Sequence, residues 1–180
     1  MNKKTRTLAV LRDGQILFMR ILDKNRRNYR RTFADKGSCI FCGKKEVLEC
    51  RGMSSRHWRI LVNRFPYMDG NVMIVPIRHV ERISDLTGEE WQDFGRVLGE
   101  TQRVLGKIFK TESFNVALNT GPQSGASIPH LHWQIVPRAF KNITALNAFA
   151  DLHIVAVTPE ETKRLIDKEK RAHPRARRTE

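Results

Sequence analysis

The sequence predicts an α+β domain with a mostly antiparallel sheet, one long helix and a C-terminal helix. Three observations support this class. Short β-prone segments recur between tight-turn dipeptides, one long stretch carries its apolar residues at helical spacing, and a second helical pattern lies near the end of the chain. The 180 residues are enough for one domain with a real core, or for one domain with tails.

The first predicted elements are two short strands around Asp13-Gly14, a dipeptide typical of tight hairpin turns. A basic, polar connector follows over residues 25–38. Three further β-prone segments lie near residues 46–51, 57–63 and 71–76. Asp69-Gly70 is predicted to form the turn between the last two of these segments.

The long helix is predicted to begin at Thr87. Thr87 as N-cap and Glu90 three residues later form a capping box. Apolar residues then recur on one side at helical spacing: Trp91, Phe94, Leu98, Leu105 and Ile108. This stripe predicts packing against a core and requires no cofactor.

A strand, a loop and another strand are predicted after this helix. They cover residues 114–119, the Gly/Ser/Pro-rich stretch 120–127, and residues 129–137. A last helix starts at Thr158, with Pro159 at its first position and Glu161 completing a second capping box. It is predicted to end by His173-Pro174.

The net charge of +14 is concentrated at the two ends of the chain. Residues 1–36 hold 11 basic and 3 acidic residues, and residues 163–180 hold 8 and 3, so the middle has a net charge of only +1. Such ends are either solvated termini or segments that bind a polyanion such as nucleic acid.

The apolar runs and the cysteines indicate the compartment. No apolar run approaches the roughly 20 residues of a membrane span, and the LAVL stretch near the start is too short for a signal peptide. The 3 cysteines argue against a disulfide framework. We therefore expect a cytoplasmic protein that does not enter a membrane.

Cys39 and Cys42, followed by Gly43, form a metal-binding knuckle pattern. The two-residue gap lets both thiolates reach one ion, and the glycine permits the tight turn that follows. A structural zinc site needs two more ligands. The candidates are Cys50, His57, His79, His130 and His153. A redox pair and two inert buried thiols are the alternatives.

The stretch PHLHWQ, residues 129–134, places polar side chains at alternate positions. In a strand His130, His132 and Gln134 would share one face, with Leu131 and Trp133 on the other. A neutral imidazole, whose pKa is about 6.5 in peptides, is a competent nucleophile toward phosphorus. The alternatives are a structural histidine pair or two metal ligands, and the spacing alone does not decide between them.

The segments LVNRFPYMDGNVMIVPIRHV and FNVALNTGPQSGASIPHLHWQIVPR resemble the histidine triad (HIT) superfamily of nucleotidyl hydrolases and transferases. The His-x-His-x-Gln form is similar to its galactose-1-phosphate uridylyltransferase and diadenosine tetraphosphate phosphorylase branches. The resemblance extends from about Cys39 to Phe140. It implies a HIT-like catalytic domain over residues 37–140. The charge, turn and capping patterns predict a basic extension with a hairpin over 1–36, and a strand, helix and basic tail over 141–180.

The resemblance implies a role for each matching residue. His132 would be the nucleophile, Gln134 would hold the α-phosphate, and Asn63 would contact the ribose. The phosphate path would be lined by Asn119, Ser127 and the loop residues Gln123 and Ser124. The ligands of a structural zinc ion would be Cys39, Cys42, His79 and His130. Small proteins of this superfamily commonly form homodimers, and we expect the same here.

We therefore expect a nucleotidyltransferase or phosphorylase that acts on a dinucleoside polyphosphate or a nucleoside-diphosphate compound through a covalent nucleotidyl-His132 intermediate. One alternative is a hydrolase of dinucleoside polyphosphates or nucleoside phosphoramidates. A second is an enzyme that removes adenylate from a nucleic-acid 5′ end and holds the backbone with its basic tails. A third is a nucleotide sensor without turnover.

Overall fold

The computed structural model describes residues 7–12, 15–20, 39–43, 47–121, 124, 126, 128–139 and 157–173. The strands are β1 (Thr7–Arg12), β2 (Gln15–Arg20), β3 (Leu48–Glu49), β4 (Trp58–Val62), β5 (Val72–Pro76), β6 (Phe114–Leu118) and β7 (Trp133–Pro137). The α-helices are α2 (Gly88–Phe109) and α4 (Pro159–Ala172), and short 3-10 turns span Arg51–Met53 and Ile83–Asp85. The predicted α+β class is confirmed.

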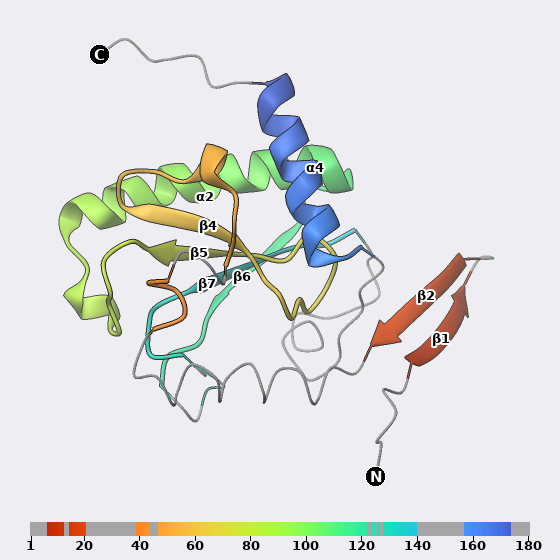
Figure 1. The fold of residues 1–180 in the computed structure, drawn as a ribbon, viewed down its shortest axis with the longest axis horizontal. Coiled ribbons are helices and arrows are strands. Elements are labelled where there is room, and N and C mark those ends of the chain that lie inside the picture. The colour runs from red at the N-terminus through yellow and green to blue at the C-terminus, as the bar shows by residue number, and fades with distance from the viewer. Residues whose placement is uncertain are drawn as a thin grey trace.

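The described strands form two antiparallel sheets (Figure 1). β1 and β2 pair with each other, as predicted, while Asp13-Gly14 lies outside the described residues. The larger sheet has the order β3-β4-β5-β7-β6, and every neighbouring pair in it is antiparallel. β7 therefore lies between β5 and β6.

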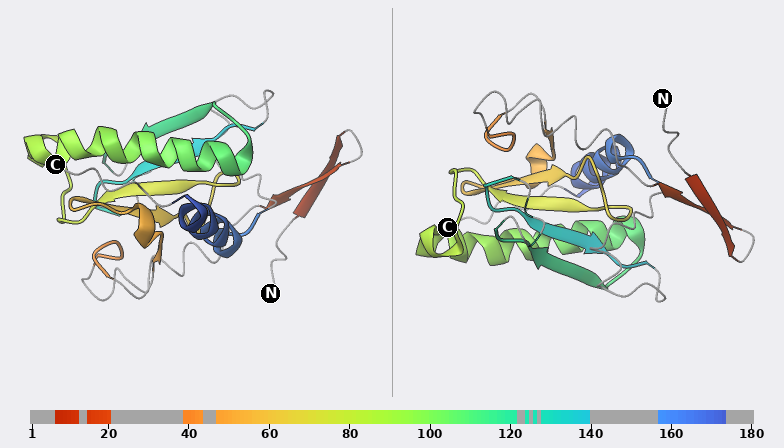
Figure 2. Two further views of the ribbon diagram at one scale, coloured as in Figure 1. Left: turned by 90° about the horizontal axis from the view of Figure 1, so that it is seen from above. Right: turned by 90° about the horizontal axis from the view of Figure 1, so that it is seen from below.

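Both helices cover one face of the larger sheet (Figures 1 and 2). Trp58, Ile60 and Val62 of β4 point to this face because side chains alternate along a strand. They pack against Phe94 of α2 and Ile166 of α4 in a core that we call the helix-side core. This burial of apolar surface holds the helices on the sheet.

The opposite face of the sheet is covered by a second apolar cluster. It joins the segment 39–43, which we call the knuckle, to β4 and β5. Its buried members are Ile40, Phe41, Leu61, Met73 and Val75, and we call it the knuckle-side cluster. The central strands are therefore buried on both faces, which explains why their sequences read as nearly continuous apolar runs.

Helix α2 begins with the predicted capping box. The Thr87 side chain accepts from the Glu90 backbone N–H, and the Glu90 carboxylate accepts from the Thr87 N–H. The predicted apolar stripe lies on the helix-side core except at Trp91, which is 40% exposed and contacts Phe94 and Trp133 only by ring edges. Trp91 lies in the first turn, at the margin of the sheet.

Helix α4 starts at Pro159, as predicted, and ends at its C-cap His173. The Thr158 hydroxyl accepts from the Glu161 N–H, which is one half of the predicted capping box. Ion pairs join α4 to α2: Lys170 Nζ lies 2.7 Å from the Glu100 carboxylate, and Lys107 pairs with Glu169 at 3.4 Å. These contacts add polar links beside the apolar core.

The predicted turn at Asp69-Gly70 is confirmed: it lies between β4 and β5, and the Asn71 N–H donates to Met68 O across it at 3.2 Å. Two strand predictions need correction. Within the described residues, the segment near 46–51 pairs only over Leu48–Glu49, because a 3-10 turn begins at Arg51. The strand predicted over 129–137 begins only at Trp133, because the Leu131 N–H donates to Val80 O at 2.7 Å instead of joining the ladder.

No helix in the described parts of the chain is long and apolar enough to cross a membrane. The connector 25–38 and the residues after His173 lie outside the described residues, as do most of the basic residues at the two ends. The role predicted for the basic ends therefore stays a prediction.

Gly70 has a backbone conformation and a packing environment that exclude a side chain. Its φ is +75°, and a Cβ there would overlap the Phe109 ring and lie 2.7 Å from Pro137 Cγ. We predict that Gly70→Ala lowers the free energy of unfolding by about 2–4 kcal/mol, from left-handed strain and overpacking together. Urea unfolding measures this change.

Gly99→Ala is the matched control. Gly99 lies in the exposed part of α2, and a Cβ there would meet nothing within 4 Å. Because alanine favours helix over glycine, this change should stabilise the protein by about 0.5–1 kcal/mol. Equal effects of the two substitutions would contradict the assignment of a special role to Gly70.

Candidate functional site

Three strands of the larger sheet end or begin at one edge. β5 ends at Pro76, β6 ends at Leu118 and β7 begins at Trp133, and the register pairs Trp133 with both Ile74 and Leu118. The connecting segments 77–86 and 119–132 therefore leave the sheet at the same edge. Most of the predicted site residues lie on these segments.

The four predicted metal ligands converge at this edge. The ligand atoms of Cys39, Cys42, His79 and His130 all lie within 4.8 Å of one another. The Cys39 Sγ is 3.3 Å from His130 Nδ1, and the Cys42 Sγ is 3.3 Å from His79 Nδ1. The cysteines are held in a tight turn, since the Cys42 and Gly43 N–H groups both donate to Cys39 O.

The far nitrogens of both histidines have partners that orient the rings. His130 Nε2 lies 3.1 Å from Pro76 O, and His79 Nε2 lies 3.3 Å from a Glu81 carboxylate oxygen. Both partners are acceptors, so each Nε2 carries the proton and each Nδ1 lone pair faces the cysteines. Burial, with the neighbouring His79 ring, lowers the pKa of His130 to about 4, so this ring is neutral.

This arrangement fits a metal ion of zinc type. Two sulfur and two imidazole donors, each imidazole fixed by a second partner, are the usual ligands of a closed tetrahedral zinc site. Such a site leaves no open position for chemistry. The donor set is therefore suited to holding the knuckle against the edge of the sheet.

The other candidate ligands lie elsewhere. Cys50 is fully buried in the helix-side core, and burial raises the pKa of its thiol to about 12. The His57 ring is 3.9 Å from the Glu89 carboxylate. His153 lies outside the described residues. Cys50 is therefore a core thiol and does not join the Cys39/Cys42 cluster.

His132 is 8% exposed and immediately precedes β7. Its Nδ1 lies 2.8 Å from the carbonyl oxygen of His130. A carbonyl only accepts, so Nδ1 carries the hydrogen and Nε2 keeps a lone pair. The Phe41 ring lies against the imidazole, with 5.1 Å between ring centroids. Leu131 turns into the helix-side core, so the predicted alternation holds although His130, Leu131 and His132 precede the strand.

Gln134 lies in β7 and is held by two asparagine side chains. Its Oε1 accepts from Asn63 Nδ2 at 3.2 Å and from Asn71 Nδ2 at 3.0 Å. These bonds use the carbonyl end of the amide and leave the –NH₂ end as a donor. Asn63 also donates to Asn71 Oδ1 and accepts from the Phe65 N–H, so both ends of its amide bind protein groups. The predicted ribose contact of Asn63 stays a prediction.

Asn71, Phe41 and Arg59 are parts of this site that the sequence did not reveal. Asn71 is 1% exposed and connects Asn63, Gln134 and the Tyr67 N–H. Arg59 is a buried arginine within β4 that donates to knuckle carbonyls. The sequence signals for two of them are weak. Asn71 stands directly before an apolar run, and Arg59 is a lone arginine inside one.

The predicted phosphate loop is described only in part. Asn119 is half-buried at the end of β6, and the Ser124 hydroxyl, which is exposed, donates to Gly121 O at 2.8 Å. Gln123 and Ser127 lie outside the described residues. The positions of these two predicted phosphate-binding residues therefore stay predictions.

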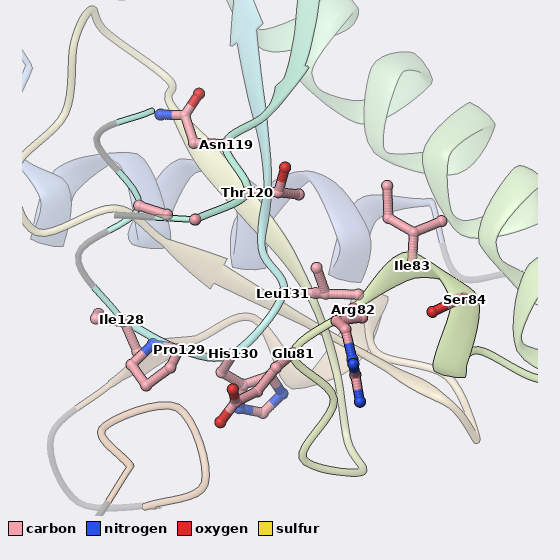
Figure 3. Close-up of a pocket in the computed structure, with 12 residues that line it drawn as sticks. Glu81, Arg82, Ile83, Ser84, Asn119, Thr120, Ile128, Pro129, His130 and Leu131 are labelled. Carbon is pink, nitrogen blue, oxygen red and sulfur yellow. The ribbon is translucent and has the colours of Figure 1, made fainter. Parts of the chain in front are cut away.

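A cavity of about 850 Å³ opens beside this segment (Figure 3). Asn119 and Thr120 line it from the end of β6, and His130 lines it from the segment before β7. The segment 81–84 forms the facing wall. The cavity thus adjoins the residue whose carbonyl holds His132.

These observations define a class of protein: an α+β domain in which a His-x-His-x-Gln row and a Cys/His cluster meet at one edge of an antiparallel sheet. The family model described as "HIT domain" matches residues 53–141. The chain thus carries a domain of the histidine triad superfamily.

Known proteins similar to this chain include two curated relatives. The bis(5′-adenosyl)-triphosphatase of Saccharomyces cerevisiae is 41% identical over 100 residues, which are 55% of this chain and 48% of that protein. The AP-4-A phosphorylase of Mycobacterium tuberculosis is 30% identical over 107 residues, 59% of this chain and 55% of that protein. The chain spans about half the length of the curated relatives it matches.

A solved structure shows the same fold. It is a zinc-bound histidine triad family protein from Mycobacterium smegmatis, with a TM-score of 0.61 and 20% identity. The match covers 76% of this chain and 95% of that one.

The amide network of Asn71 and Gln134 should be energetically coupled. We predict that Asn71→Ala lowers the free energy of unfolding by about 1–3 kcal/mol, because its loss leaves buried polar partners unsatisfied. With Gln134→Ala, a double-mutant cycle should give a coupling energy of about 0.5–3 kcal/mol. Urea unfolding of the three variants measures it.

Thr101→Ala provides the control cycle. Thr101 is also a buried polar residue, but its hydroxyl donates to Val97 O within α2. Asn71→Ala and Thr101→Ala should be additive within about 0.5 kcal/mol. Additivity of Asn71→Ala with Gln134→Ala would contradict the network.

Proposed function

We propose that this protein is a nucleotidyltransferase or phosphorylase that acts on dinucleoside polyphosphates or nucleoside-diphosphate compounds through a covalent nucleotidyl-His132 intermediate. The observation that carries the proposal is the 2.8 Å contact between His132 Nδ1 and His130 O. It fixes the tautomer that has a lone pair on Nε2, the atom required for attack on phosphorus.

The first step forms one bond and breaks one. The Nε2 lone pair of His132 attacks the α-phosphorus, a P–N bond forms, and the P–O bond to the remaining phosphates breaks with its electron pair going to the leaving oxygen. In the second step an oxygen of inorganic phosphate or of water attacks the same phosphorus, the P–N bond breaks with its electron pair returning to Nε2, and the proton of the attacking oxygen is released to solvent, which restores neutral His132. Two easier displacements thus replace a difficult one.

Gln134 supports the transition state as a hydrogen-bond donor. Negative charge spreads over the phosphoryl oxygens during the transfer, and a fixed –NH₂ group stabilises it without reorganisation. Asn63 and Asn71 hold the other end of this amide. Asn119 is the second donor that we assign to the phosphate path.

The identity of Gln134 also favours one kind of leaving group. An amide does not titrate, so it cannot deliver a proton to the departing atom. The phosphate chain of a dinucleoside polyphosphate leaves as a stable anion, whereas the amine of a phosphoramidate needs a proton. This difference favours anhydride substrates over phosphoramidates.

The cavity beside His130 and the relatives agree with such substrates. A volume of about 850 Å³ is within the range of pockets that hold small ligands, and the cavity could take the part of the substrate beyond the α-phosphate. The two relatives are a bis(5′-adenosyl)-triphosphatase and an AP-4-A phosphorylase. Hydrolysis at the second step is the alternative to phosphorolysis, and one relative of each kind supports keeping both.

His132→Ala should abolish adduct formation. After brief incubation of the wild type with a panel of dinucleoside polyphosphates and nucleoside-diphosphate sugars, intact-mass analysis should show one added nucleoside monophosphate. The variant should show none, and its turnover should fall by about 1000-fold or more, as expected for loss of a nucleophile. His57→Ala, which removes a histidine outside the site, should keep both properties.

Product analysis separates the two forms of the second step. With inorganic phosphate present, a phosphorylase forms a nucleoside diphosphate, whereas a hydrolase forms the monophosphate with or without it. Turnover that persists in His132→Ala would contradict the mechanism. Nucleotide binding by the wild type without any turnover would identify a sensor instead.

We also propose that the Cys/His cluster binds zinc. The convergence of two thiols and two oriented imidazoles supports this, and one solved structure of the same fold is a zinc-bound protein. When bound, zinc would hold the knuckle to the segment that carries His130. The chemistry of phosphoryl transfer would remain with His132 and Gln134.

Purified protein should contain about one zinc ion per chain, as a four-ligand site requires. Cys42→Ser should lose most of this metal in the presence of a moderate chelator, because a hydroxyl is a poor replacement for a thiolate ligand. Cys50→Ser, a substitution in the helix-side core, should keep it. Metal analysis after gel filtration measures both, and equal zinc contents in the two variants would contradict the assignment.

Three further expectations remain predictions. They are the cytoplasmic location, the homodimer, and the use of the basic ends to hold a nucleic acid that carries a 5′-adenylate. The last would give binding that weakens steeply with salt, while turnover of a free dinucleotide would respond only mildly.

A further inference from the structure

Phe41 connects the knuckle to both histidines of the row. It occupies the third position of the knuckle and is 4% exposed. Its ring centroid lies 5.1 Å from that of His132, with the rings inclined by 55°, and 5.9 Å from that of His130 at 73°. The ring thus lies against the imidazole on which the proposed chemistry depends.

Arg59 holds the backbone of Phe41 on the sheet. Its guanidinium donates to Phe41 O and, at 3.5 Å, to Gly43 O. A third bond of 3.0 Å reaches the Glu49 carboxylate, whose other oxygen accepts from the Ser54 hydroxyl. Burial acts to raise the pKa of Glu49, but Arg59 and Ser54 outweigh it and keep the pKa below its usual value.

The position of the knuckle therefore has two determinants. Its two cysteines face His79 and His130, while its carbonyls are tied to β4 through Arg59. A planar guanidinium can serve several acceptors at fixed angles, which an ammonium group cannot. The Arg59 contacts therefore help to set where the Phe41 ring lies against the two histidines.

We propose that Phe41 is a positioning residue for His132, and that Arg59 keeps Phe41 in place. The inference rests on the proposed function of His132. The hydrogen bond from Nδ1 to His130 O restrains the imidazole, and the Phe41 ring packs against the same imidazole from the knuckle. The Phe41 ring removes the alternative orientations and so aims Nε2, and a misplacement of about 1 Å can reduce a transfer rate by about 100-fold.

Phe41→Ala tests the proposal on zinc-loaded protein. With metal content unchanged, the rate of nucleotidyl-His132 formation in a single turnover should fall by about 10–100-fold, while affinity for the nucleotide changes by less than about threefold. Phe41→Leu, which keeps much of the bulk, should recover part of the rate. Val75→Ala is the control, since Val75 is buried in the same knuckle-side cluster and makes no ring contact with His132.

A magnetic-resonance signal tests the position without relying on turnover. In histidine-labelled protein the His132 Nδ1 proton, bound to His130 O, should give a slowly exchanging downfield resonance that is absent in His132→Ala. It should persist in Val75→Ala and broaden or vanish in Phe41→Ala. If the wild type forms no adduct, the proposed function fails, while this signal still decides the role of Phe41.

Arg59→Met and Arg59→Lys complete the test. Both should weaken the same resonance and slow adduct formation with zinc still bound, and Lys should recover little because its compact ammonium lacks the planar fork of donors that reaches these three acceptors. If Arg59→Met does not fold, Arg59→Lys retains the charge opposite Glu49. An unchanged rate and an unchanged resonance in Phe41→Ala, or equal losses in Phe41→Ala and Val75→Ala, would overturn the proposal.

Discussion

His130 holds the site together through three contacts made by three different parts of one residue. Its Nε2 donates to Pro76 at the end of β5, and its Nδ1 faces the two cysteines. Its backbone carbonyl accepts from Nδ1 of His132. His130 thus connects the sheet, the Cys/His cluster and the proposed nucleophile, and a displacement of His130 would disturb all three contacts.

The polar row is buried, and this constrains every group within it. Polar atoms without access to water must have hydrogen-bond partners, or folding becomes costly. The row satisfies this condition by local means: His132 uses a carbonyl two residues away, and Gln134 uses Asn63 and Asn71. The carbonyl partner determines which nitrogen of His132 carries the hydrogen, and the two asparagines determine how the Gln134 amide is oriented. The hydrogen bonds that burial requires therefore also orient the groups of the proposed site.

Local signals predicted the elements whose geometry is decided locally. The capping box at Thr87 and the helical stripe after it correctly marked α2, since caps and periodicity depend on residues a few positions apart. The start of β7 was wrong because it depends on Val80, about fifty positions away, which takes the Leu131 N–H out of the ladder. The pattern of polar and apolar residues survived this error, since alternation needs only an extended backbone.

The same difference between local and distant determinants applies to the candidate site. The residue types of the CxxC pattern and of PHLHWQ indicated metal binding and phosphorus chemistry, but not which histidines join the cysteines. That pairing came from a family resemblance. The roles of Asn71, Phe41 and Arg59 could not be predicted because each depends on partners that are distant in the sequence. For example, no local pattern indicates that a carbonyl of the knuckle lies beside an arginine of β4.

The two faces of the larger sheet differ in the contacts that cover them. The helix-side core is large and apolar, and it holds α2 and α4 without reference to the row. The knuckle-side cluster is small, and by itself it would be a weak cover for β4 and β5. Arg59 and the four potential metal ligands strengthen that cover with directional contacts, which specify position more sharply than apolar packing does. His132, the proposed nucleophile, packs against this cover through Phe41.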